Sequence, residues 1–174
     1  MGAALRRVVV LGCAGSGKST VAAELARRTG LPLVPRDEHY WQPGWTAPPD
    51  DACRVTQRGL VAEPARVLDG NYASSFDERL PYADTVIVLE TPRWRCLVNV
   101  VGRALRRRGT EVAPGCPMTV DRGLLRYVWS FPRVHRPRLE AGLATVGPEV
   151  IVVHLRTRRQ AQQFVAGCSA APLD

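Results

Sequence analysis

Lysine is almost absent from this chain, because Lys18 is the only lysine among its 24 lysine and arginine residues. Without a second lysine, the sequence cannot contain the N-K-x-D type motif with which guanine-specific GTPases read their base. Arginine supplies every other basic side chain, so position 18 indicates a need for a compact ammonium group rather than a wide planar guanidinium.

Long apolar runs and paired cysteines are also lacking. No run approaches the roughly 20 apolar residues that span a bilayer, and the short run at 8–11 predicts a buried strand rather than a signal peptide. The chain has no C-x-x-C motif, and its cysteines are odd in number and widely spaced: Cys13, Cys53, Cys96, Cys116 and Cys168. We therefore expect reduced thiols, no disulfide framework or zinc site, a cytoplasmic location and no membrane association.

Negative charge is scarce, which gives a net charge of +8 and an isoelectric point near 9.9. Such a balance favours anionic partners, from nucleotides to nucleic acids. The basic residues are concentrated in one segment, because residues 93–108 hold six arginines and no acid.

Short β-branched runs alternate with longer helical patterns along the chain. Strands are expected at 6–12, 31–35, 65–70, 83–91 and 149–155. Helices are expected at 17–30, at 50–63 with an aspartate cap, at 92–108, over most of 120–146 with breaks near Pro132 and Pro137, and at 157–167. Loops are expected at 37–49 and 109–119, and a loose tail at 168–174. This alternation predicts one α/β domain over residues 1–174, with a five-stranded parallel sheet flanked by helices.

The segment Gly12-x4-Gly17-Lys18-Ser19 matches the phosphate-binding pattern G-x-x-x-x-G-K-[ST], between a predicted strand and a predicted helix. Its glycines allow a tight turn that directs N–H groups at phosphate oxygens, and the helix start adds its positive dipole end. Lys18 is expected to reach the β- and γ-phosphates, and the Ser19 hydroxyl to bind Mg²⁺. The motif thus predicts a P-loop NTPase that binds ATP and Mg²⁺ through Gly12, Cys13, Ala14, Gly15, Ser16, Gly17, Lys18, Ser19 and Thr20.

Several longer stretches carry a family resemblance that covers roughly residues 7–166. They read GSGKST, WQPGW, VLDGNY, YADTVIVLETPRWRC and FPRVHRPR. With these stretches the chain resembles the adenylate-kinase-like P-loop proteins often labelled DNA topology modulation proteins. The resemblance implies a nucleoside- or nucleotide-kinase-like fold with a helical lid, while the family label implies DNA.

Residues 68–70 read LDG, which is similar to the start of the D-G-F-P-R segment of adenylate kinases. Asp69 and Gly70 match that segment, whereas Asn71 and Tyr72 depart from it. The resemblance places Asp69 beside the magnesium, and the alternative is a helix cap. Arg79 is a candidate replacement for the arginine that the departure removes.

Residues 99–103 read NVVGR, which is similar to the R-I-V-G-R segment that leads into the lid of adenylate kinases. Gly102 and Arg103 match, and Asn99 stands where an arginine would hold the adenine. We expect a lid over about 103–138, in which Arg103 and Arg107 share a helical face and clamp the transferring phosphoryl group. The alternative is a solvated, arginine-rich helix end.

Asp37 follows the second predicted strand, so it is a candidate for binding the acceptor hydroxyl and acting as general base, or else a loop cap. Trp41 and Trp45 either stack on an acceptor ring or fix the loop to the sheet. Trp94 and Trp129 fall in helical patterns and are expected to be packing residues.

Together these features predict ATP-dependent phosphoryl transfer to a small hydroxyl- or phosphate-bearing acceptor. We expect the acceptor to lie between Asp37, the tryptophan loop, the turn Gly70, Asn71 and Tyr72, and Arg79. The alternatives are a nucleic-acid-associated ATPase that modulates DNA topology, or a nucleotide sensor without turnover. The chain lacks a helix-turn-helix or zinc-finger signature, which favours the kinase. We expect a monomer or homodimer.

Overall fold

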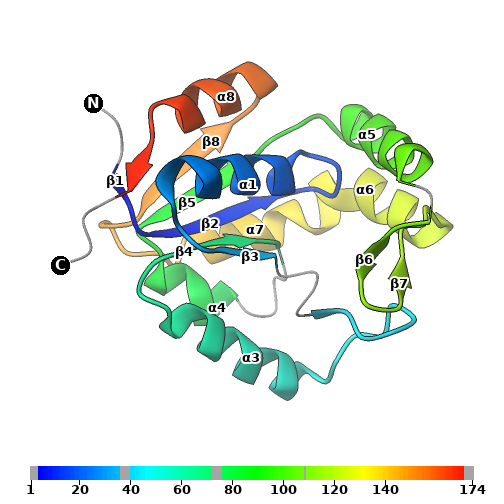
Figure 1. Ribbon diagram of the computed structural model, residues 1–174, viewed down its shortest axis with the longest axis horizontal. Helices are drawn as coiled ribbons and strands as arrows, with labels where there is room; N and C mark the ends of the chain where they lie inside the picture. The colour runs from blue at the N-terminus through cyan, green and yellow to red at the C-terminus, as the bar shows by residue number, and fades with distance from the viewer. Residues whose placement is uncertain (1–3, 36–39, 72–75, 108, 171–174) are drawn as a thin grey trace.

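Five parallel strands form the centre of the protein, in the computed structural model that describes residues 4–35, 40–71, 76–107 and 109–170 (Figure 1). Their spatial order is β3 (Leu33–Pro35), β4 (Arg66–Asp69), β2 (Arg7–Gly12), β5 (Thr85–Leu89) and β8 (Ile151–Leu155). The predicted five-stranded parallel sheet is therefore confirmed. Strand β2 lies in the middle, paired with β4 on one side and β5 on the other, so the segment that follows it begins at the centre of the sheet edge.

Helices cover both faces of this sheet. One face is covered by α1 (Lys18–Thr29) and α8 (Arg158–Ala166). The other carries α3 (Asp50–Ala62), α4 (Phe76–Arg79), the short 3₁₀ helix η2 (Leu80–Tyr82), α5 (Arg93–Arg106), α6 (Arg122–Val134) and α7 (Arg136–Leu143). The apolar runs that predicted the strands are continuous because both faces of the sheet are buried.

Side chains that alternate along β2 build two separate cores. Val8 and Val10 pack towards Leu25 of α1, whereas Val9 and Leu11 pack towards the helices of the opposite face. Because successive residues of a strand point to opposite faces, one short valine-rich strand contributes to both layers.

Two segments expected to be irregular contain short strands. The predicted loop 109–119 holds an antiparallel hairpin of β6 (Glu111–Ala113) and β7 (Cys116–Pro117), and the expected loose tail pairs β9 (Ser169–Ala170) with β1 (Ala4–Leu5). The sequence did not indicate these short strands, because strands of two or three residues are too short to show an alternating pattern. The rest of the expected tail, residues 171–174, lies outside the described residues.

The predicted helical segment 120–146 is broken at His135, two residues before Pro137, which sits in the first turn of α7, where its missing N–H costs nothing. The expected break near Pro132 was wrong, because α6 continues through Pro132 to Val134. The expected aspartate cap of α3 was also wrong, because extended Pro49 occupies the cap position and Asp50 is the first helical residue.

None of the described helices has both the length and the apolar character needed to cross a bilayer.

The two cores predict how leucine substitutions will act. Leu68 of β4 is 0 % exposed and Leu105 of α5 is 67 % exposed. We expect Leu68→Ala to lower the free energy of unfolding by about 2–5 kcal/mol, because it leaves a cavity between the sheet and the helices. Leu105→Ala should change it by less than about 0.5 kcal/mol. Urea denaturation of both variants tests this, and equal losses would contradict the assignment of Leu68 to the core.

Candidate active site

The loop between β2 and α1 begins with a glycine whose backbone no other residue adopts readily. Gly12 has φ +148°, and a Cβ atom there would lie 2.8 Å from both the Leu89 carbonyl oxygen and Ser16 Oγ. Gly15 has φ +79°, and its Cβ would lie 2.3 Å from the carbonyl oxygen of Cys96 in α5. The loop thus passes directly over β5 and α5, where only glycine leaves enough room.

Four main-chain carbonyls of this loop each accept a hydrogen bond from a side chain. The pairs are Asn71 Nδ2 to Gly12 O (2.6 Å), Lys18 Nζ to Cys13 O (3.1 Å), Asn99 Nδ2 to Gly15 O (2.8 Å) and Thr91 Oγ1 to Ser16 O (3.0 Å). The donors come from four different parts of the chain: the exit of β4, the start of α1, α5 and the exit of β5. The loop carbonyls are therefore held by the surrounding protein.

The N–H groups of the loop have the opposite arrangement. Within the described residues, the main-chain N–H groups of Gly15, Gly17, Lys18 and Ser19 donate to no protein acceptor. The last two begin α1, where the helix dipole is positive. A cluster of unpaired donors at a helix start, with the Lys18 ammonium beside it, is an arrangement that binds phosphate.

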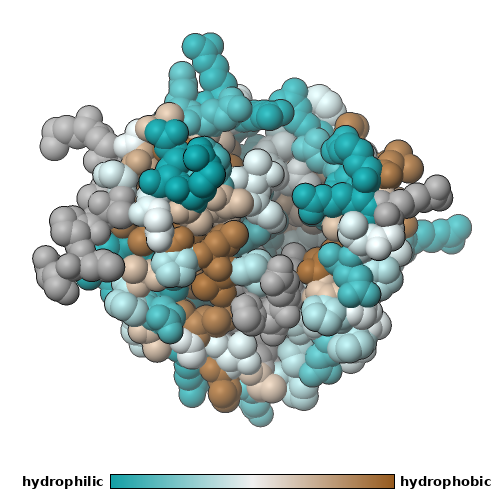
Figure 2. Space-filling model, viewed as in Figure 1, coloured by the Kyte–Doolittle hydropathy of each residue, from teal (hydrophilic) through white to brown (hydrophobic). Residues whose placement is uncertain are grey.

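The same edge of the sheet is visibly open. Figure 2 shows the surface hollowed between the side of the molecule formed by α1 and the side formed by α5. Because the phosphate loop joins β2 to α1 and packs on α5, this hollow lies in the region of the loop. Ligands of open parallel sheets bind at the carboxyl ends of the strands, as they would here.

Two oxygen groups near the loop fit a magnesium ion. Ser19 is exposed at the start of α1, with no hydrogen bond from its hydroxyl to another described residue. Asp69 ends β4 directly beside β2, paired in register with Val10, and is 8 % exposed. Mg²⁺ prefers one or two such protein oxygens together with water and substrate phosphates. Within the described residues no cluster of three histidine, cysteine or acidic side chains offers a denser metal site.

Two buried thiols, Cys13 of the loop and Cys96 of α5, lie within hydrogen-bond reach of each other. Hydrogen bonding to Cys96 and burial raise the pKa of the Cys13 thiol far above its usual range, so this thiol stays neutral. Cys13, Cys96, Cys116 and Cys168 are all free, as the sequence predicts, and the side chain of Cys53 lies outside the described residues. Cys13 therefore contributes packing and its main chain to the loop.

The arginines at the end of α5 differ in environment. Arg103 is partly buried, and its Nε is inaccessible to solvent without a hydrogen-bond partner among the described residues. Arg107 is exposed and forms the C-cap of α5, because the helix ends at Arg106. The Arg107 N–H donates to the Arg103 carbonyl at 2.9 Å, so the two residues are one helical turn apart, and their joint action on a phosphoryl group stays a prediction. Of these two arginines, only Arg103 carries a buried donor without a partner among the described residues.

The turn after β4 is held by side chains that the sequence assigned to the acceptor. Arg79 is 0 % exposed, and its Nη1 donates to the Gly70 carbonyl at 2.6 Å while the guanidinium lies 4.9 Å from the centre of the Phe76 ring. In this position Arg79 supports the Gly70 turn and does not reach an open surface. Asp37 and Tyr72 lie outside the described residues.

The tryptophan turn is joined to the hairpin that follows α5. Trp41 and Trp45 meet edge to face with ring centres 5.4 Å apart, and Trp45 has an unusual φ of +60° for a bulky residue. Gly44 N donates to Gly115 O at 3.0 Å, and Cys116 Sγ donates to Gln42 O at 3.2 Å. Segments about seventy residues apart in the sequence thus lie side by side, with the turn against the β6–β7 hairpin (Figure 1).

A charge cluster that sequence reasoning missed lies at the exit of β5. Glu90 accepts hydrogen bonds from Arg136 Nη2 (3.0 Å) and Arg156 Nε (3.0 Å), and its Oε1 lies 3.1 Å from His154 Nδ1. Partial burial opposes ionisation, but Arg156, His154 and Arg136 outweigh it and hold the pKa of Glu90 below its ordinary value. The position of Glu90 at a strand end was the available signal, but its partners come from α7, from β8 and from the residue that follows β8.

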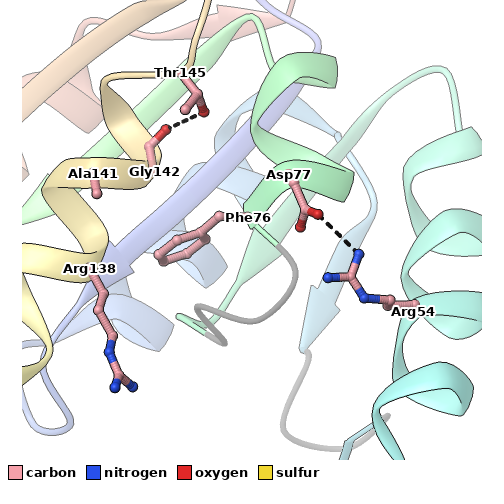
Figure 3. Close-up of a pocket in the computed structure, with 7 residues that line it drawn as sticks. All are labelled: Arg54, Phe76, Asp77, Arg138, Ala141, Gly142 and Thr145. Carbon is pink, nitrogen blue, oxygen red and sulfur yellow. Dashed lines mark hydrogen bonds and ion pairs between the residues drawn. The ribbon is translucent and has the colours of Figure 1, made fainter.

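A second recess of about 390 Å³ lies between α3, α4 and α7 (Figure 3). Arg54 Nη1 pairs with Asp77 Oδ2 at 3.0 Å, and Phe76 lies between this pair and Arg138. Gly142 lets α7 approach, because a Cβ there would lie 2.7 Å from Phe76 Cδ2. None of the site residues predicted from the sequence lines this recess.

One curated protein resembles part of this chain in sequence. No protein-family model matches the chain. The uncharacterized protein YqaC of Bacillus subtilis (strain 168) is 26 % identical over 112 residues, which are 63 % of this chain and 63 % of that protein. The chain thus aligns with less than two thirds of the length of this curated relative, and the resemblance to DNA topology modulation proteins stays a prediction.

Solved structures of small kinases share the architecture. A sugar kinase from Janibacter sp. HTCC2649 superposes with a TM-score of 0.51 at 21 % identity, covering 93 % of this chain and 91 % of that one. Shikimate kinase from Acinetobacter baumannii has a TM-score of 0.58 at 17 % identity, covering 93 % of this chain and 89 % of that one. Shikimate kinase from Bacteroides thetaiotaomicron has a TM-score of 0.58 at 16 % identity, covering 94 % of this chain and 95 % of that one. The chain therefore has the fold of P-loop kinases.

The Glu90 cluster predicts a pH dependence of stability. In the folded protein the pKa of Glu90 lies below its ordinary value of 4.5. The ion pairs of Glu90 therefore stabilise the fold fully above pH 4.5, and this stabilisation is lost as the pH falls through the pKa of Glu90 in the folded state. We expect Glu90→Gln to lower the free energy of unfolding by about 1–3 kcal/mol at neutral pH, and by much less at about pH 3.

Denaturation at both pH values measures this difference. Glu140→Gln is the matched control, because it removes only an exposed pair with Arg136 and should cost less than about 0.5 kcal/mol. A loss for Glu90→Gln that is constant between the two pH values would contradict the prediction.

Proposed function

We propose that the protein transfers the terminal phosphoryl group of ATP to a small hydroxyl-bearing acceptor. The observation that carries this proposal is the phosphate loop, whose carbonyls are held by side chains while the N–H groups of Gly15, Gly17, Lys18 and Ser19 have no protein acceptor. Such N–H groups, gathered at the start of a helix beside an ammonium, favour an anionic ligand. The P-loop kinase fold of the structural neighbours supports the same conclusion.

Each polar group at the loop has a part in the proposed reaction. The loop N–H groups and the Lys18 ammonium bind the β- and γ-phosphates, which moves Lys18 from the Cys13 carbonyl that it contacts now. Ser19 and Asp69 would hold Mg²⁺, which neutralises phosphate charge when bound. Arg103 supplies a further positive charge, because its buried Nε can be satisfied by a phosphoryl oxygen in the closed state.

The acceptor is proposed to lie between the tryptophan turn and the turn after β4. Its hydroxyl oxygen attacks the γ-phosphorus, the bond to the β–γ bridging oxygen breaks, ADP leaves, and the hydroxyl proton passes to the Asp37 carboxylate. The neighbours include a sugar kinase and a shikimate kinase in complex with shikimate, which supports a hydroxylated ring as the acceptor of this chain too. Trp41 would then stack against that ring.

A nucleic-acid-associated ATPase is the second candidate, favoured by the surface of α5 and α6. Trp94 and Trp129, which were expected to pack inside, are more than half exposed. Arg93 lies 4.0 Å above the centre of the Trp129 ring, and neither helix contains an acidic residue. Aromatic and arginine side chains on one basic surface can bind nucleic acid.

An acceptor screen distinguishes the two candidates. ADP release is measured with sugars, cyclic polyols, nucleosides, nucleotides and duplex DNA, each against the acceptor-free background. The kinase proposal predicts stimulation and a phosphorylated product with one class of small hydroxylated compound. Stimulation by DNA alone, with steeply salt-dependent DNA binding, would favour the second candidate and contradict the first.

The lone lysine gives the sharpest test of the phosphate loop. We expect Lys18→Ala to abolish measurable transfer and to weaken ATP binding at least about tenfold, because the β- and γ-phosphates lose their ammonium. Lys18→Arg should be nearly as impaired, because a planar guanidinium does not fit along the loop. Titration calorimetry and product formation test both variants, and an arginine variant equal to the parent would contradict the stated need for lysine.

Arg103 is expected to act mainly on the rate. Arg103→Ala should lower turnover about 100-fold while changing ATP affinity less than about threefold, because the contact forms chiefly in the transition state. Arg106→Ala is the matched control one turn away, where the side chain is exposed, and its turnover should stay within about twofold of the parent. Parental turnover in Arg103→Ala would remove Arg103 from the mechanism.

A further inference from the structure

The chain contains only two asparagines, and both hydrogen-bond the phosphate loop. Asn71 follows β4 and Asn99 lies in α5, so they approach the loop from separate elements. Each uses its Nδ2 as donor to a loop carbonyl: Gly12 O for Asn71 and Gly15 O for Asn99. Neither pairing is visible in the sequence, because the partners are 59 and 84 positions apart.

Asn71 replaces a peptide group in the sheet. Strand β4 ends at Asp69, and Gly70 N makes a last main-chain bond to Val10 O at 3.2 Å. At Gly12 the side-chain amide of Asn71 makes the hydrogen bonds that a further peptide group of β4 would make. Its Oδ1 accepts from Gly12 N at 2.9 Å, and its Nδ2 donates to Gly12 O at 2.6 Å. Both main-chain groups of the first loop residue are thus satisfied by one amide.

Asn99 acts from the opposite side of the loop. It is exposed on α5, and its Nδ2 reaches Gly15 O at 2.8 Å. The backbone of α5 comes so close that a Cβ at Gly15 would lie 2.3 Å from Cys96 O. Asn99 therefore fixes the carbonyl of the same glycine that α5 touches.

We infer that Asn71 and Asn99 are positioning residues that orient the two ends of the phosphate loop for a polyphosphate. A peptide unit is planar and trans, so a carbonyl held in one direction sets the N–H of the next residue in the opposite one. Asn71 thereby orients the unit between Gly12 and Cys13. Asn99 orients the unit between Gly15 and Ser16, whose N–H closes the loop by donating to Cys13 O at 3.1 Å.

This inference rests on the proposed function, and it revises what the sequence suggested for both residues. Asn71 was a candidate for contacting the acceptor, and Asn99 stood in the place of an adenine-binding arginine. Both amides are instead committed to the loop, and a side chain that holds the main chain can improve phosphate binding without touching the ligand.

The test compares two ligands that share only their phosphates. Titration calorimetry measures ATP and inorganic tripolyphosphate, each with Mg²⁺, at a temperature at which circular dichroism shows every variant folded. We expect Asn71→Ala to raise both dissociation constants about tenfold, since both of its hydrogen bonds to Gly12 are lost, and Asn99→Ala about threefold. Asn71→Asp should bind more weakly than Asn71→Ala, because its carboxylate faces Gly12 O and adds negative charge beside the phosphates.

Two control variants separate positioning from general stability. Gln160→Ala removes an amide that accepts from Arg156 N (2.9 Å) and Thr157 N (3.1 Å) at the start of α8, so it should lower the melting temperature without changing either affinity. Tyr127→Phe removes only the hydroxyl that Asn71 Nδ2 contacts at 3.2 Å, and should leave both affinities within about twofold of the parent.

Unchanged affinities in both asparagine variants, with lower melting temperatures alone, would overturn the inference. A loss for ATP without a loss for tripolyphosphate would also overturn it, because the residues would then act on the nucleoside. If Asn71→Ala does not fold, exposed Asn99 decides the outcome. A parent protein that binds neither ligand overturns the proposed function itself, which distinguishes the two failures.

Discussion

A loop that points its N–H groups at a ligand must place its carbonyls elsewhere, and this requirement organises the site. Each peptide unit carries both groups, and a buried carbonyl without a donor is costly. Here Asn71, Lys18, Asn99 and Thr91 provide the donors. They converge because β4 and β5 flank β2 and α5 packs under the loop, so the strand order itself supplies the partners.

Charge is distributed so that the phosphate region keeps available cations. Glu90 engages Arg136, His154 and Arg156 at the exit of β5. Arg79 is turned inward to the Gly70 carbonyl. Among the described residues, the Lys18 ammonium donates to a main-chain carbonyl alone, which a phosphate can replace at little cost, and the buried Nε of Arg103 has no partner there. In a chain with a net charge of +8, the arginines therefore serve different purposes according to their neighbours.

The sequence predicts those features that depend on local pattern. The apolar runs of β2, β4 and β5 indicate buried parallel strands, and the G-x4-G-K-S spacing indicates the loop and the helix that follows. Contacts between distant segments were not accessible in this way. The Asn71 amide meets Gly12 only because β4 lies beside β2, and Pro43 packs against Gly115 of the short β6–β7 hairpin from more than seventy positions away. Arg79 looked like a ligand-binding arginine because sequence gives no measure of burial.

The tryptophan turn and the hairpin form a contact between the predicted lid segment and the expected acceptor side. The hairpin belongs to the segment 103–138 that was predicted to act as a lid, and the turn belongs to the expected acceptor side. Gly44 and Gly115 are joined by a main-chain hydrogen bond, and Pro43 leaves no room for a side chain at Gly115. The hairpin can therefore move only by breaking these contacts or by carrying the turn with it. Because α5 holds both Arg103 and the Asn99 contact to the loop, and leads directly into this hairpin, one continuous set of contacts runs from the phosphate loop to the aromatic turn.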